Sequence, residues 1–314
     1  MEPSVRPRSA TSRWKRILLA LAILFCLLFA AGRITARYLM NTLALTTGPN
    51  GLDTPASQGL PFERTAIPSG SRHLDSYVVI AASGCVDPPV MLIYHGVGET
   101  ISEWVKAQRF LYDHCVSSVI YDPTGSGDSS RPARFEYEAE DSIAAYDFTT
   151  HHFPGTRVYL LGHSMGNGPM LETVPHLSPQ PAGVIVASAF ASLRSQPRTQ
   201  GNLFYRVLAY TIPDWWNNVK AVAAIHVPIL IVHSDVDRVN PAEGGLRIFA
   251  AANQPKTLTL LHGYNHNALY QAPTEEWWSA ALAFVRAPSP PRPSAIPHAD
   301  SRPATRPTQF NADN

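Results

Sequence analysis

One serine of the chain lies in the setting that a nucleophile requires. The motif Gly162-His163-Ser164-Met165-Gly166 follows the apolar segment 158–161 and precedes a segment with helical character. A G-x-S-x-G motif between a strand and a helix is typical of a tight turn that exposes the serine hydroxyl above a sheet. The motif alone is common by chance. Its position between a strand and a helix is what predicts Ser164 as the nucleophile. A plain glycine–serine helix start is the alternative.

A serine hydroxyl is a poor nucleophile and needs a base, which in turn needs an orienting acid. When the serine lies on such a turn, the acid and then the histidine follow it along the chain. Asp237 follows the predicted strand 227–233 and His266 follows the predicted strand 257–261, so we predict them as acid and base. Asp235 and His262 lie nearer to the ends of the same strands and compete for these roles.

Acyl transfer also requires hydrogen-bond donors for the oxyanion that develops on the substrate. The backbone N–H of Met165, directly after the nucleophile, is one expected donor. The loop His95-Gly96-Val97-Gly98 follows the predicted strand 90–94, and its glycines let the N–H of Val97 turn toward Ser164 as the second donor. A simple glycine-rich turn is the alternative interpretation of this loop.

Short apolar runs alternate with helical segments through the middle of the chain, which predicts an α/β fold with a mostly parallel, doubly wound sheet. Residues 191–226 interrupt the alternation with aromatic residues in proline-broken segments and predict a lid-like insertion; an ordinary packed connection is the alternative. The predicted strands are 73–82, 90–94, 117–121, 158–161, 183–187, 227–233 and 257–261, and the predicted helices are 102–114, 137–152, 165–177, 243–253 and 274–286.

The composition narrows the class of protein. Lys plus Arg is 25 and Asp plus Glu is 24, a net charge of +1, so no basic surplus points to nucleic acid. Apolar residues make up 45% of the chain, enough for a sizeable core. Three cysteines exclude a disulfide scaffold or a cysteine-based zinc cluster. The histidine pair at 151–152 lacks a third ligand at metal spacing, so we predict no metal site.

The two ends differ from the predicted domain at 62–286. A basic segment at 1–16 precedes a predicted transmembrane signal-anchor at 17–34, and a linker is expected at 35–61. The positive charges before the apolar run predict a cytoplasmic N-terminus and an extracytoplasmic domain, periplasmic or lumenal. Cleavage of the run as a signal, which would release a secreted protein, is the alternative. The proline-rich residues 287–314 predict a disordered tail.

These motifs together resemble the α/β-hydrolase superfamily over about residues 62–286. They occur in family order: the H-G-x-G loop, the G-x-G-x-S loop at 125–129, the elbow at 162–166, the acid loop that ends at Pro241, and the G-x-x-H at His266. Within the superfamily the chain looks most like the membrane-anchored monoacylglycerol and lysophospholipid lipase branch. That likeness rests on residues 204–216, 218–220 and 245–249. Pro123-Thr124 departs from the Arg-Gly-like pair usual in the branch.

The resemblance implies hydrolysis of carboxylic esters, lipid-like or small, through a Ser164–Asp237–His266 triad and an acyl-enzyme, with Val97 and Met165 as the oxyanion hole. It implies no cofactor, no metal and no nucleic-acid partner, and it leaves protein partners unknown. A serine peptidase or thioesterase on the same fold is one alternative. A catalytically silent, membrane-tethered interaction protein is the other.

The resemblance also bears on two cysteines. In the strand order of the family, the strands at 90–94 and 117–121 are neighbours, which brings Cys85 and Cys115 to the amino-terminal edge of the sheet, far from the expected site. A disulfide there is geometrically plausible and would fit an oxidising compartment. Two buried free thiols are the alternative.

Overall fold

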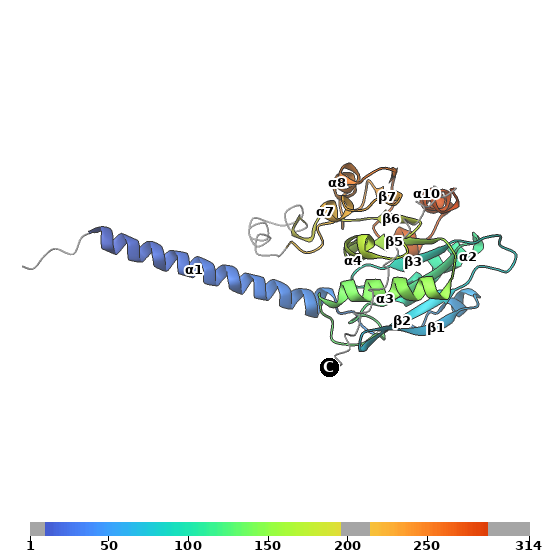
Figure 1. The fold of residues 1–314 in the computed structure, drawn as a ribbon, viewed down its shortest axis with the longest axis horizontal. Coiled ribbons are helices and arrows are strands. Elements are labelled where there is room, and N and C mark those ends of the chain that lie inside the picture. The colour runs from blue at the N-terminus through green and yellow to red at the C-terminus, as the bar shows by residue number, and fades with distance from the viewer. Residues whose placement is uncertain (1–9, 196–213, 288–314) are drawn as a thin grey trace, which may run out of the picture.

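The computed structural model describes residues 10–195 and 214–287, which build an eight-stranded sheet with helices on both faces (Figure 1). The strand order is β1-β2-β4-β3-β5-β6-β7-β8, with β1 and β2 antiparallel to their neighbours and all other pairs parallel. The predicted fold class is confirmed. The strands are β1 Glu63–Ser69, β2 Arg72–Val79, β3 Val90–Tyr94, β4 Ser117–Tyr121, β5 Val158–His163, β6 Gly183–Ala187, β7 Ile229–Ser234 and β8 Lys256–Leu261.

The central strands β3, β4 and β6 are buried along their whole length because helices cover both faces of the sheet. One core lies between the sheet and α3, α4, α7 and α8, and the other lies between the sheet and α2, α9 and α10. The helices are α2 Val105–Asp113, α3 Tyr137–His152, α4 Asn167–Thr173, α7 Asn218–Val222, α8 Glu243–Ala251, α9 Ala268–Gln271 and α10 Glu275–Arg286.

Several elements differ from the sequence prediction. Strand β1 was not predicted, because it lies at the sheet edge and exposes most of its residues, so it has no apolar run. The predicted helix 102–114 begins as a short 3-10 turn, Ile101–Trp104, before α2. The predicted helix 165–177 is interrupted at both ends by 3-10 turns; the second contains Pro175, which lacks the N–H that would continue α4.

Helix α1, Ala10–Leu39, projects away from the α/β domain (Figure 1). Within it and the following turn, the segment Arg13–Thr42 contains an 18-residue window with a mean hydropathy of 2.6 and is long and apolar enough to cross a membrane. The helix therefore extends beyond the predicted anchor at 17–34, into residues expected to form a linker. All but the first residue of the predicted tail, and residues 196–213 of the predicted lid-like insertion, lie outside the described residues.

The rest of the predicted linker, after helix α1, contacts the α/β domain. Leu45 is buried against Trp216 and Ala133, and Leu60 is also buried. The backbone N–H of Thr47 donates to the carbonyl of Gly125 at 3.1 Å. Glycine and proline give this segment the composition of a linker, but burial of Leu45 and Leu60 favours its packing against the fold.

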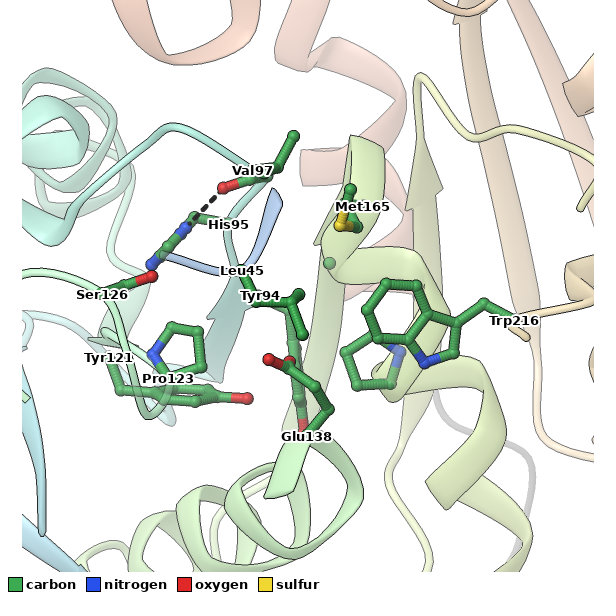
Figure 2. Close-up of a pocket in the computed structure, with 13 residues that line it drawn as sticks. Leu45, Tyr94, His95, Val97, Tyr121, Pro123, Ser126, Glu138, Met165 and Trp216 are labelled. Carbon is green, nitrogen blue, oxygen red and sulfur yellow. Dashed lines mark hydrogen bonds between the residues drawn. The ribbon is translucent and has the colours of Figure 1, made fainter. Parts of the chain in front are cut away.

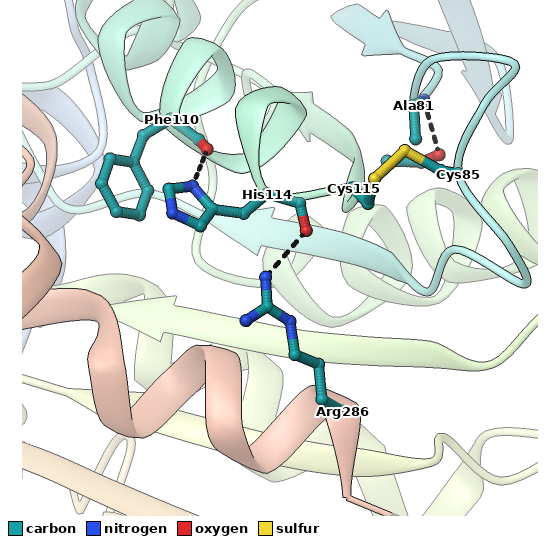
Figure 3. Close-up of a disulfide and its surroundings, with 7 residues drawn as sticks. Ala81, Cys85, Phe110, His114, Cys115 and Arg286 are labelled. Atoms are coloured by element: carbon teal, nitrogen blue, oxygen red, sulfur yellow. Dashed lines mark hydrogen bonds between the residues drawn. A yellow bond between two sulfur atoms is a disulfide. The ribbon is translucent and has the colours of Figure 1, made fainter.

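Cys85 and Cys115 form a disulfide at the amino-terminal side of β3 and β4 (Figure 3), with their Cα atoms 5.5 Å apart. Of the two alternatives open from the sequence, the structure shows the bridge and not two free thiols. The bridge joins the loop before β3 to the end of α2, on the opposite side of the sheet from the carboxyl ends of the strands.

Replacing both bridge cysteines, Cys85→Ser with Cys115→Ser, is expected to lower the free energy of unfolding by roughly 3 kcal/mol, since a bridge across 30 residues restricts the unfolded chain. Chemical denaturation of the full chain in detergent measures this loss. Cys26→Ser, which removes the exposed cysteine of α1, is the matched control. A double variant that unfolds at the same denaturant concentration as the parent would show that the bridge contributes nothing.

Candidate active site

Ser164 lies where strand β5 turns into helix α4. Its φ is +51°, in the left-handed region that a non-glycine residue rarely adopts. The turn passes so close to strand β3 that a Cβ on Gly166 would lie 2.2 Å from the carbonyl oxygen of Tyr94. The glycine is therefore required for the turn to fit, and the strained turn presents the serine side chain at the carboxyl edge of the sheet.

The structure brings the three predicted side chains into one hydrogen-bonded chain. His266 Nε2 lies 2.9 Å from Ser164 Oγ, and His266 Nδ1 lies 2.8 Å from Asp237 Oδ2. Asp237 follows β7 and His266 follows β8, and both strands run parallel to β5. Because the carboxyl ends of parallel strands meet at one edge, residues distant in the sequence converge there.

The environment of Asp237 favours its charged form. Its Oδ1 accepts hydrogen bonds from the backbone N–H groups of Val239 and Asn240, at 2.9 and 2.8 Å. Burial opposes ionisation, but the hydrogen bond and charge of His266 outweigh it, so the pKa of Asp237 lies below its ordinary value. An ionised Asp237 accepts the Nδ1–H of His266, which leaves Nε2 able to accept the proton of Ser164.

The competing candidates from the sequence do not join this chain. Asp235 and His262 pair with each other, with His262 Nδ1 2.8 Å from Asp235 Oδ2. Their side chains are 45% and 84% exposed, so the pair lies at the surface. The structure thus separates the two acid–histidine pairs and places only Asp237 and His266 against the serine.

The glycine-rich loop after β3 touches the serine. A Cβ on Gly96 would lie 3.1 Å from the Cβ of Ser164, and the N–H of Gly96 is already committed to Glu99 Oε2 at 2.8 Å. Val97 and Met165 line the pocket beside the serine (Figure 2). That their backbone N–H groups donate to an oxyanion stays a prediction.

A buried network beneath the site was not predicted from the sequence. Glu99 accepts from Trp104 Nε1 at 2.9 Å and pairs with His163 Nδ1 at 2.9 Å, while His163 Nε2 faces the carbonyl of His266 at 3.0 Å. Burial opposes the charge of Glu99, but His163 and His95 outweigh it and lower the pKa of Glu99 to about 2. The network links the glycine-rich loop, the elbow and the histidine loop, and so fixes their relative positions.

His95 anchors the other side of the glycine-rich loop. Its Nε2 lies 3.1 Å from Asp122 Oδ1, which also accepts from the N–H of Ile101 at 3.0 Å. Burial disfavours a charged imidazole here, but Asp122 outweighs it and raises the pKa of His95 to about 9. The only sequence signal for these partners was the position of His95 at the start of the H-G-x-G loop.

The pocket beside Ser164 is lined by residues from distant parts of the chain (Figure 2). Trp216 comes from the predicted insertion, and Leu45 comes from the segment that follows helix α1. Pro123 and Ser126 come from the loop after β4. The segment next to the apolar helix is thus part of the site.

Comparison with known proteins finds hydrolases that are similar to this chain. A family model described as serine aminopeptidase, S33, matches residues 88–221, which include the glycine-rich loop and the elbow. The esterase Pf2001 of Pyrococcus furiosus superposes with a TM-score of 0.62 at 16% identity, covering 78% of this chain and 97% of the esterase. The chain has the fold of the α/β-hydrolases, and its sequence is similar to serine hydrolases of that fold.

Two further proteins are similar to this chain. The lysophosphatidylserine lipase ABHD12 of Danio rerio is 26% identical over 230 residues, which cover 64% of this chain and 59% of the lipase. The chain therefore spans less than two thirds of the length of that relative. A membrane phospholipase A described as a bacterial virulence factor superposes with a TM-score of 0.56 at 16% identity, covering 86% of this chain and 98% of the phospholipase.

Proposed function

We propose that this α/β-hydrolase cleaves carboxylic esters, lipid-like or small, through an acyl-enzyme on Ser164. The observation that carries the proposal is the hydrogen-bonded chain from Ser164 through His266 to Asp237. His266 Nε2 takes the proton of the serine as Oγ attacks the ester carbonyl, and Asp237 orients the ring and stabilises its charged form. The N–H groups of Val97 and Met165 donate to the oxyanion.

The second half of the reaction reverses these roles. Collapse of the tetrahedral intermediate breaks the bond to the alcohol, which leaves with the proton from His266 Nε2. His266 then takes a proton from water, the water attacks the acyl carbonyl, and the serine regains its proton as the acid leaves. No cofactor enters this scheme, because all proton transfers pass through His266.

The substrate class and cellular location belong to the same proposal. Relatives named as a lysophosphatidylserine lipase and a membrane phospholipase A support an ester lipid as substrate. Helix α1 would anchor the chain in the membrane, with the N-terminus cytoplasmic and the catalytic domain on the far side. The Cys85–Cys115 disulfide favours such an oxidising compartment. Release as a secreted protein after cleavage of the apolar segment is the alternative.

Peptide hydrolysis is the second candidate, because the matching family model is described as a serine aminopeptidase. The two functions separate in one panel: nitrophenyl esters of graded chain length, a monoacylglycerol, a lysophospholipid, and aminoacyl amides, each tested on the full chain in detergent. We expect hydrolysis of the esters, with the amides cleaved at least about a hundredfold more slowly. Cleavage of the amides alone would favour the peptidase and contradict the ester proposal.

A further inference from the structure

One buried acid at the pocket has no role in the reaction just described. Glu138 lies in the first turn of α3 and is 6% exposed, and its side chain points from the helix into the pocket between Tyr121 and Trp216 (Figure 2). Among the residues that the structure describes, none forms a hydrogen bond or ion pair with its carboxyl group. Burial, reinforced by the charge of Asp141, raises the pKa of Glu138 to about 8.

Another acid on the same helix, Asp141, shows how a carboxylate with a structural role is bonded here. Asp141 accepts from Ser69 Oγ at 2.6 Å, from Arg72 at 3.1 Å and from the N–H of Thr124 at 2.8 Å. Asp141 thus holds strands and loops together, whereas no side chain or backbone group in the described part of the chain bonds to the carboxyl group of Glu138. A buried carboxyl without a partner destabilises the fold, so its hydrogen-bonding capacity is available to a molecule in the pocket.

The chemistry of the site indicates which part of an ester reaches Glu138. His266 passes its proton to the departing alcohol, so the alcohol lies on the His266 side of Ser164. The described lining of the pocket includes Val97 and Met165, beside the oxyanion position, but no residue of the loops that carry Asp237 and His266. The acyl part of the substrate therefore extends into the pocket, toward α3.

We propose that Glu138 is a specificity-determining residue whose carboxyl group hydrogen-bonds to a hydroxyl group on the acyl part of the substrate. An unsubstituted acyl chain would exclude water from the carboxyl group and offer it no hydrogen bond. A hydroxyl on the chain would supply that hydrogen bond. A protonated carboxyl can both donate to and accept from such a hydroxyl. The role rests on the proposed ester hydrolysis and names a substrate class for it: esters of hydroxylated acids.

The test varies only the acyl group. Nitrophenyl hexanoate is compared with nitrophenyl esters of hexanoic acids that carry one hydroxyl on the second, third or sixth carbon, and with the ester of an aminohexanoic acid. Parent enzyme, Glu138→Leu and Glu138→Gln are assayed for kcat/KM. We expect the parent to prefer at least one hydroxylated ester by roughly tenfold, Glu138→Leu to lose this preference, and Glu138→Gln to keep most of it.

Two controls separate this role from a structural one. Glu138→Leu should melt at the same temperature as the parent or higher, because it removes an unpartnered buried carboxyl, and it should label normally with a fluorophosphonate. A lower melting temperature with an equal loss of activity on all esters would show a structural role and overturn the proposal.

The remaining outcomes are equally decisive. A parent enzyme without preference for any hydroxylated ester, or a preference that survives in Glu138→Leu, would overturn the assignment of Glu138 while leaving ester hydrolysis intact. A preference for the amino ester over every hydroxylated ester, lost in both variants, would overturn the assignment of a hydroxyl as the group that Glu138 binds. A parent that hydrolyses none of the esters and takes no fluorophosphonate would overturn the proposed function itself, and this role with it.

Discussion

Ser164→Ala is expected to lower kcat for ester hydrolysis by roughly three to six orders of magnitude, because it removes the atom that forms the acyl-enzyme. The side chain has no other large role in the fold: its Oγ contacts His266 at 2.9 Å and Asn240 Nδ2 at 3.5 Å. The variant should therefore fold normally and still bind substrate. Steady-state kinetics with a nitrophenyl ester measures the loss.

The matched control is Ser57→Ala, which removes a surface hydroxyl that bonds only to the carbonyl of Thr54 within its own turn. It should leave kcat within about twofold of the parent, as surface substitutions usually do. Activity that survives in Ser164→Ala at more than about one hundredth of the parent value would show that another group attacks the ester.

Asp237→Asn is expected to lower kcat by roughly four orders of magnitude, with a much smaller effect on KM. The amide keeps the shape of the side chain but can donate a hydrogen bond to His266 Nδ1, which favours the tautomer whose Nε2 cannot take the serine proton. The pKa of Asp237 is held low by His266, so the charge that stabilises the imidazolium is also lost. Single-turnover kinetics would place the loss in the acylation step.

Asp235→Asn is the matched control, because it changes the other acid of the same loop in the same way. Its partner His262 is exposed and does not reach Ser164, so the variant should keep kcat within about twofold. If Asp235→Asn proved crippling and Asp237→Asn harmless, the observed pairing of acid and histidine would not be the one that works in solution.

The sequence predicts the central sheet well because each buried strand is a short apolar run between loops. The bounds of β3, β4 and β6 match the prediction, and Ser164, Asp237 and His266 could be placed because each follows such a strand. Strand β1 could not be predicted in this way, since an edge strand that faces solvent shows no continuous apolar run.

The parts of the site that sequence patterns did not predict are those that depend on contacts between distant segments. Glu99 and His163 meet only because β3 and β5 are neighbours in the sheet, and neither residue belongs to a pattern that requires the other. Leu45 lies in a segment with the composition of a linker, and Glu138 resembles the ordinary acids of a first helical turn. Their positions in the pocket depend on packing, which single-sequence patterns do not encode.

The most direct measurement of the central claim, that His266 and Asp237 activate Ser164, is site-mapped labelling of the full chain in detergent with a fluorophosphonate. The reagent reacts with an activated serine, so the account predicts one adduct, on the peptide that contains Ser164. It also predicts that His266→Ala abolishes the adduct while the protein stays folded. An adduct on another residue, or unchanged labelling of Ser164 in His266→Ala, would contradict the account.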